Sequence, residues 1–250
     1  MKARLAAAGL HFLASAFVIS LSLYVIYFIW YPNPFYTMHS VFDAVKIVLA
    51  VDLVLGPFLT LVIFNTSKPR KELIRDISII LIIQVSALTW GMHVTYKMRP
   101  TFFVFQADTF YPIIREDIDL ENLNKEVSPP AIWQSPVTIY IEPLKGMDAI
   151  QRLKEAAKGG GLTGEMYKTE KYKPLSLKTD NEYRQDIISQ AMSYDFLQKS
   201  KTWKSGVEEL VLSQGGVIED YLFYPVENDR FRGLIAFKKT DFSIAGLVAP

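Results

Sequence analysis

The sequence contains no cysteine, so disulfides, thiolate nucleophiles and cysteine-based metal sites are all excluded. Histidine occurs only three times, at His11, His39 and His93, and none has the HExxH spacing of a zinc-binding helix. No GxSxG motif is present either. The stretch 159–164 fits GxGxxG, but it follows an expected helix instead of a strand, which argues against a nucleotide loop. These absences predict a protein that is not an enzyme, with no catalytic residue, no metal and no cofactor.

Charge is also scarce, at 21% of the residues, and it is unevenly distributed. Residues 1–100 carry nine Lys and Arg against four Asp and Glu, whereas residues 101–250 carry 18 against 22. The basic half is the more hydrophobic half, a combination that indicates a membrane and not a nucleic acid as its partner.

Three apolar runs occupy the first hundred residues. Residues 10–31 contain no Asp, Glu, Lys or Arg, and about 20 apolar residues suffice to cross ~30 Å of hydrocarbon. This run continues well past Ala14-Ser15-Ala16, so it is longer than the core of a signal peptide. The second run extends from about residue 40, where Ser40 and Asp43 resemble a capping box, to residue 64, and the third covers residues 77–96. We therefore expect three transmembrane helices.

The positions of the basic residues predict the topology. The stretch 65–76 between the second and third runs holds four Lys and Arg, whereas the stretch between the first two runs holds none. By the positive-inside rule, the N-terminus and the 65–76 loop are cytoplasmic. Three crossings then place the rest of the chain on the far side, although Lys97 and Arg99 there run against the rule.

Asp52 falls near the middle of the second apolar run. A carboxylate at this depth costs a few kcal/mol and must face protein or water, so two interpretations stay open. Asp52 is either a structural residue bonded inside the helix bundle, with Gln84 or Ser86 as its partner, or a recognition point for a partner helix or a proton path.

Gly56 and Pro57 follow Asp52 in the same run. A proline inside a helix removes one backbone N–H, so Pro57 should free the carbonyl of Leu53 and kink the helix. Such a kink could keep a groove open between the helices.

The remaining 150 residues read as a small soluble α+β domain. Alternating and β-branched stretches predict strands at 101–106, 136–142 and 244–248 and a hairpin of 219–224 with 231–238. Apolar periodicity predicts helices at 147–157, 180–199 and 205–213, and residues 108–112 are expected to form a turn. The predicted organisation is thus a transmembrane domain, 1–98, followed by an α+β domain, 99–250.

Several motifs in residues 40–112 occur in the order and spacing of a known family. They are Leu55-Gly56-Pro57-Phe58-Leu59-Thr60-Leu61, Lys68-Pro69-Arg70-Lys71-Glu72-Leu73, Gln84-x-x-Ala87-Leu88-x-Trp90-Gly91 and Arg99-Pro100-x-Phe102-x-Val104-Phe105-x-x-Asp108-x-Phe110. This pattern resembles the type IV pilin accessory proteins of the TfpZ, TfpY and FimB type. The resemblance is dense over 40–112, agrees in the placement of the first helix, and carries no equally specific motif in the C-terminal domain.

The resemblance implies an accessory protein of type IV pilus biogenesis in the bacterial inner membrane, with a cytoplasmic N-terminus and a periplasmic C-terminal domain. Its expected partners are the major pilin, through the pilin's membrane helix and head, and the lipid bilayer, with other pilus-machine components as further partners and no nucleic acid. Such a protein would act as a chaperone that modulates pilin stability, pilus assembly or dynamics. The expected partner-binding positions are Asp52, Gly56, Pro57, Gln84, Phe105 and Asp108. The alternatives are a pilin-modifying enzyme and a proton-linked membrane sensor or transporter built around Asp52.

Overall fold

The fold was analysed in a computed structural model of the chain, which describes residues 1–38, 45–46, 49–141, 167–175, 182–228 and 230–250. Contacts divide the chain into two compact units. Unit 1 comprises Met1–Trp30 and Ser40–Arg99, and unit 2 comprises Tyr31–His39 and Pro100–Pro250. The short segment between the first two apolar runs therefore packs with the soluble half, which the sequence did not indicate.

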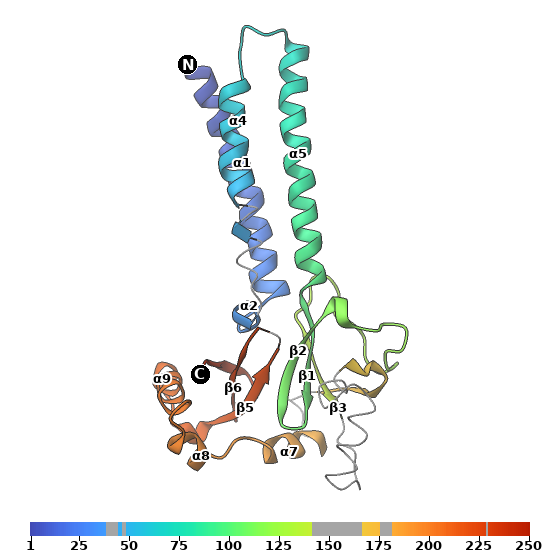
Figure 1. The fold of residues 1–250 in the computed structure, drawn as a ribbon, viewed down its shortest axis with the longest axis vertical. Helices are drawn as coiled ribbons and strands as arrows, with labels where there is room; N and C mark the ends of the chain where they lie inside the picture. The colour runs from blue at the N-terminus through green and yellow to red at the C-terminus, as the bar shows by residue number, and fades with distance from the viewer. Residues whose placement is uncertain (39–44, 47–48, 142–166, 176–181, 229) are drawn as a thin grey trace. The chain divides into compact units, whose positions relative to one another are not determined.

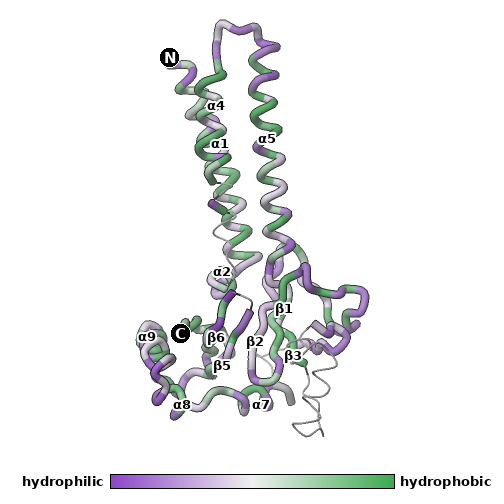
Figure 2. The backbone as a smooth tube through the Cα atoms, in the orientation of Figure 1, coloured by the Kyte–Doolittle hydropathy of each residue, from purple (hydrophilic) through white to green (hydrophobic). Residues whose placement is uncertain are grey.

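Unit 1 is built from long apolar helices (Figure 1). Its elements are α1 (Lys2–Tyr24), continued by the π-helical η1 (Val25–Trp30), then η2 (Ala50–Leu55), α4 (Gly56–Ile63) and α5 (Arg70–Lys97). Figure 2 shows these helices as hydrophobic for most of their length, with hydrophilic residues at the turn between α4 and α5. Helix α4 packs against both α1 and α5.

Two of the three expected crossings are helices long and apolar enough to span a membrane, Lys2–Trp30 and Arg70–Lys97. The second expected crossing is described as a shorter apolar helix, Ala50–Ile63, and the Ser40 and Asp43 of its predicted cap lie outside the described residues. The third helix begins at Arg70, seven residues before its predicted start. It follows Pro69 directly, a residue that suits a helix N-terminus because it has no N–H to leave unpaired, so residues 70–76 are helix and not loop.

Unit 2 contains one mixed sheet. Among the described residues its strand order is β4-β3-β1-β2-β5-β6-β7. The strands are β1 (Pro100–Gln106), β2 (Thr109–Ile114), β3 (Val137–Ile141), β4 (Tyr172–Pro174), β5 (Tyr221–Glu227), β6 (Arg232–Lys238) and β7 (Ile244–Val248). The helices are α2 (Phe35–Met38), α7 (Glu182–Ser189), α8 (Tyr194–Lys199) and α9 (Lys204–Gln214), with 3-10 turns η3 (Arg115–Asp117), η5 (Thr169–Lys171) and η6 (Ile218–Asp220). The α+β class of the soluble half is confirmed.

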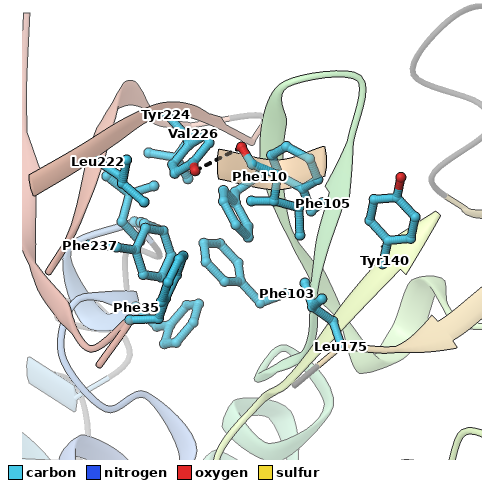
Figure 3. Packing of buried hydrophobic residues seen from close by; sticks show 14 residues of the cluster. Phe35, Phe103, Phe105, Phe110, Tyr140, Leu175, Leu222, Tyr224, Val226 and Phe237 are labelled. Carbon is cyan, nitrogen blue, oxygen red and sulfur yellow. Dashed lines mark hydrogen bonds between the residues drawn. The ribbon is translucent and has the colours of Figure 1, made fainter. Parts of the chain in front are cut away.

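The two faces of the sheet bury different cores because side chains alternate along each strand. One core joins α2 and α7 to the sheet through Phe35, Phe103, Phe110, Tyr224 and Phe237 (Figure 3). The rings of Phe35 and Phe103 pack edge to face at 5.1 Å. On the opposite face, α8 and α9 cover β5 and β6, and a third cluster covers β1 and β3.

Helix α7 is held over the first core by two hydroxyl groups. The Tyr224 hydroxyl donates to the carbonyl of Ile187 at 2.9 Å, the bond dashed in Figure 3, and the Tyr140 hydroxyl donates to the carboxylate of Asp186. Burial raises the pKa of Tyr224 well above its ordinary value, so this phenol stays a donor.

Two predictions for unit 2 were wrong in detail. Residues 109–112 belong to β2, and the turn is confined to Ala107 and Asp108, which have φ of 46° and 74°. The helix predicted over 180–199 is two helices, because the N–H of Met192 donates to the carbonyl of Phe223 at 2.9 Å instead of continuing the helix. Ser193 then caps α8 by accepting the N–H of Phe196. The helix predicted at 147–157 and the GxGxxG stretch lie outside the described residues.

Candidate partner-binding site in the apolar helices

Polar side chains from α1, α4 and α5 meet inside unit 1. The Nδ1 of His11 lies 2.6 Å from the hydroxyl of Thr60, and its Nε2 lies 2.8 Å from the Oε1 of Gln84. Thr60 and Gln84 are buried, and His11 is half-buried. Because Oε1 can only accept, Nε2 of His11 carries the proton, and in neutral His11 the Thr60 hydroxyl donates to Nδ1.

Asp52 joins the same group of side chains through Gln84. We call His11, Asp52, Thr60 and Gln84 the polar cluster. The Nε2 of Gln84 donates to the backbone carbonyl of Asp52 at 3.4 Å. The expected link between Asp52 and Gln84 is therefore present, but this bond is made to the main chain of Asp52.

The π-helical turn η2 explains why the Asp52 carbonyl needs an external donor. The N–H of Gly56 donates to Val51, five residues back, and not to Asp52, four residues back. In this register the next N–H would come from residue 57, which is a proline and has none. The distortion expected at Gly56-Pro57 is present as a π turn, and it leaves the carbonyl of Asp52 to the side-chain amide of Gln84.

Asp52 itself is 5% exposed, and its Oδ1 has no hydrogen-bond partner among the described residues. The carboxyl lies inside the bundle, so in this structure it presents no surface to a partner helix. An unpaired buried polar atom is destabilising by ~1–3 kcal/mol, so the Oδ1 of Asp52 lowers the stability of the helix bundle.

Gly56 allows the cluster to form. A Cβ at this position would lie 2.0 Å from the Nε2 of Gln84, closer than real contacts allow. Any other residue at 56 would push the Gln84 side chain away from the Asp52 carbonyl.

A small groove with a cavity volume of about 20 Å³ lies in the same unit, beside α1, η1 and α5. Leu88, Gly91, Met92 and Thr95 line it from α5, and they continue the face that carries Gln84, because residues three, four and seven apart share one face of a helix. The other lining residues are Ile19, Ser22, Leu23, Ile26, Val45 and Leu49. The groove is thus almost entirely apolar. It lies closer to the C-terminal end of α5 than the polar cluster does.

The structure brings together four of the six predicted partner-binding residues: Asp52, Gly56, Pro57 and Gln84. The other two belong to unit 2. Phe105 is fully buried in the core between Phe110 and Tyr224, and Asp108 is exposed in the β1–β2 turn, where it accepts the Thr109 hydroxyl at 2.7 Å. Phe105 therefore contributes to packing, and its role and that of Asp108 in partner binding stay predictions.

His11 and Thr60 are the members of the cluster that the sequence did not assign. Each is a polar residue in an apolar run, a signal that a pairing of polar positions across the runs could have used. Within the described ranges, no group of three or more His, Asp and Glu side chains could hold a metal ion.

Comparison with known proteins places the chain in a family. The family model of the fimbrial assembly protein FimB matches residues 1–39. The fimbrial assembly protein of serogroups C1 and C2 from Dichelobacter nodosus is 37% identical over 115 residues, which are 46% of this chain and 88% of that protein. The chain belongs to the FimB family of fimbrial assembly proteins. The resemblance to type IV pilin accessory proteins is thereby confirmed.

Two longer relatives match over a smaller share of their length. The fimbrial assembly proteins of serogroups I and E1 from the same organism are 37% and 39% identical, and the chain covers 45% of each. The chain thus spans about half the length of these two FimB-family relatives. No solved structure matches the chain.

Proposed function

We propose that this FimB-family protein is a non-enzymatic accessory protein of type IV pilus biogenesis that binds its major pilin through the pilin's apolar membrane helix. A side chain of that helix would enter the groove beside α1 and α5 while the helix packs against the bundle, and the bound pilin would be stabilised or presented for assembly. The observation that carries the proposal is a small apolar groove between long apolar helices in a family whose members are named for fimbrial assembly.

Small side chains support a helix as the occupant. Ser22, Gly91 and Thr95 are among the residues that line the groove. In lipid, helices associate through close van der Waals packing, and small residues permit the backbones to approach. The polar cluster next to the groove would fix the lining helices, so Asp52 would act by holding the bundle and not by touching the pilin.

The contacts within unit 2 support three crossings. The Asn228 side chain donates to the carbonyl of Met38 at 3.1 Å, so the segment after the first helix and the C-terminal part lie on the same side of the membrane. Between these two points α5 crosses once, so a second crossing is needed to return the chain, and the apolar stretch that ends at Ile63 would supply it. With a cytoplasmic N-terminus, unit 2 is then periplasmic.

Site-specific photocrosslinking in native inner membranes tests pilin binding. A photoreactive residue at Met92 lines the groove, whereas Trp90, two residues away, is 70% exposed and points elsewhere. We expect a pilin adduct at Met92 and little or none at Trp90, at equal expression. Equal labelling at the two positions, or none at Met92, would contradict the proposal.

A second candidate function, a proton-linked sensor, is favoured by one observation. The buried Asp52 carboxyl, whose Oδ1 has no hydrogen-bond partner among the described residues, lies in the same cluster as His11, the kind of arrangement that intramembrane proton paths use. A pilus phenotype that responds to pH in the parent and not in Asp52→Asn would favour this function, and pH-independent pilin binding in both would exclude it.

A further inference from the structure

We propose that the turn of residues 131–134 anchors unit 2 in the headgroup region of the bilayer through Ile132 and Trp133. This inference concerns contact with lipid. It does not depend on whether the protein binds pilin.

The turn presents its apolar side chains rigidly. The N–H of Ala131 donates to the Oε1 of Gln134 at 2.7 Å, and the N–H of Gln134 donates to the carbonyl of Ala131 at 3.0 Å. Pro130, which is buried, precedes the turn and restricts its backbone. Ile132 is nevertheless 47% exposed and Trp133 is 72% exposed. A fixed, exposed indole next to an isoleucine forms a small apolar patch at the tip of this turn.

The strand register places this turn at one end of the sheet. Strands β1 and β3 are parallel, and Phe102 pairs with Val137. Residues that precede Val137 therefore lie toward the end at which β1 starts, at Pro100. The other segment that follows a membrane helix reaches the same region, because Phe35 packs against Phe103.

This end of the sheet cannot lie far from the bilayer. Only Met98 and Arg99 separate the end of α5 from the start of β1, and three Cα–Cα steps span at most about 11 Å. Tryptophan is enriched at the membrane–water interface because its ring is apolar while its N–H seeks a polar partner. The bilayer interface therefore fits this turn better than a protein surface does.

The absence of cysteine allows a spin-label test in the full chain. A nitroxide on Ser135→Cys, two residues from Trp133, reports on the turn and leaves the tryptophan in place. The matched control is Ser213→Cys on α9, also exposed and adjacent to Leu212, which is 77% exposed. Gly216, three residues after Ser213, lies beside Tyr221, the first residue of β5. Because β2 and β5 are parallel, Tyr221 lies toward the β1–β2 turn, at the end of the sheet opposite to Pro100. The control label therefore lies away from the end that we place at the bilayer.

Proteoliposomes of pure lipid are the sample, and the measurement is the collision rate of each label with a water-soluble nickel chelate. We expect the label at 135 to be protected severalfold relative to the label at 213, and Trp133→Ser to remove that protection. Near-ultraviolet circular dichroism would verify that the Trp133→Ser protein is folded.

A label at 135 that is as accessible as the control in lipid, or protection that persists in Trp133→Ser, would overturn the proposal. Protection that arises only after pilus proteins are added would also overturn it, and would assign the turn to a protein partner. None of these three results bears on the groove crosslink at Met92, so the two proposals can fail separately.

Discussion

The two units use aromatic and aliphatic residues in opposite ways. In unit 2, Phe110 is fully buried and touches the rings of Phe103, Phe105, Tyr224 and Phe237. In unit 1, large apolar residues such as Phe17 (73% exposed) face outward, and buried hydrogen bonds join the helices instead. The contrast is the one expected if unit 1 lies in lipid and unit 2 in water. Lipid gives apolar side chains no reason to leave the surface, so packing and a few polar contacts would hold the helices.

The largest expected difference between the units is in the effect of truncating one phenylalanine in each. Phe110→Ala should lower the free energy of unfolding of unit 2 by about 3–5 kcal/mol, because it leaves a cavity in a dry core. Phe17→Ala should change stability by less than about 0.5 kcal/mol, since the side chain faces outward. Denaturant titrations of both variants in nanodiscs measure the two effects, and equal losses would show that the units do not differ in this respect.

Adding a methyl group at residue 56 tests how much the polar cluster contributes to the stability of unit 1. Gly56→Ala places a Cβ 2.0 Å from the Gln84 Nε2 and should destabilise the helix bundle by about 1–3 kcal/mol. Gly9→Ala is the matched control, because a Cβ at residue 9 meets nothing within 4 Å. Unfolding of the purified protein by SDS, followed by circular dichroism, measures both variants. The cluster would be irrelevant to stability if the two curves coincided.

Removing the amide that satisfies the Asp52 carbonyl should have a smaller effect. Gln84→Leu leaves this carbonyl and the Nε2 of His11 without a partner, with an expected loss of about 0.5–2 kcal/mol. The neighbouring Val85→Leu, at a position that is 61% exposed, should leave the SDS curve unchanged. A Gln84→Leu protein as stable as the parent would mean that the π turn is satisfied in another way.

The smallest effect concerns pH and is confined to unit 2. The side-chain amide of Asn122 holds the pKa of Asp119 below its ordinary value, and the backbone N–H of Ser243 does the same for Asp241. A lowered pKa in the folded state means that the stabilisation is present above about pH 4 and is lost as the pH falls through the lowered values. Thermal unfolding at pH 7 and pH 3 should show a smaller pH-dependent loss in the Asp119→Asn and Asp241→Asn double variant than in the parent.

Much of unit 2 could be predicted because its strands alternate. The stretches at 101–106 and 136–142, the hairpin and the last strand are all present as strands. Strand β2 was missed because Pro112 made the segment look like a turn, and the break between α7 and α8 was missed because it depends on a distant carbonyl, that of Phe223. Tertiary contacts of this kind leave no local signal.

Part of the site in unit 1 could also be predicted from the sequence. Asp52, Gly56, Pro57 and Gln84 are exceptions in apolar runs, so they stand out in the sequence. The register shift of the π turn does not, and it decides which carbonyl Gln84 binds. His11 and Thr60 gain their roles only when the helices are placed side by side.

Blocking the groove tests the central proposal, pilin binding in unit 1, most directly. The measurement is the amount of major pilin that co-purifies from solubilised membranes with Met92→Trp, which fills the groove, and with Val85→Trp, which changes an exposed position on the same helix. We expect Met92→Trp to lose most of its pilin and Val85→Trp to retain the parental amount. Equal retention by the two folded variants would contradict it.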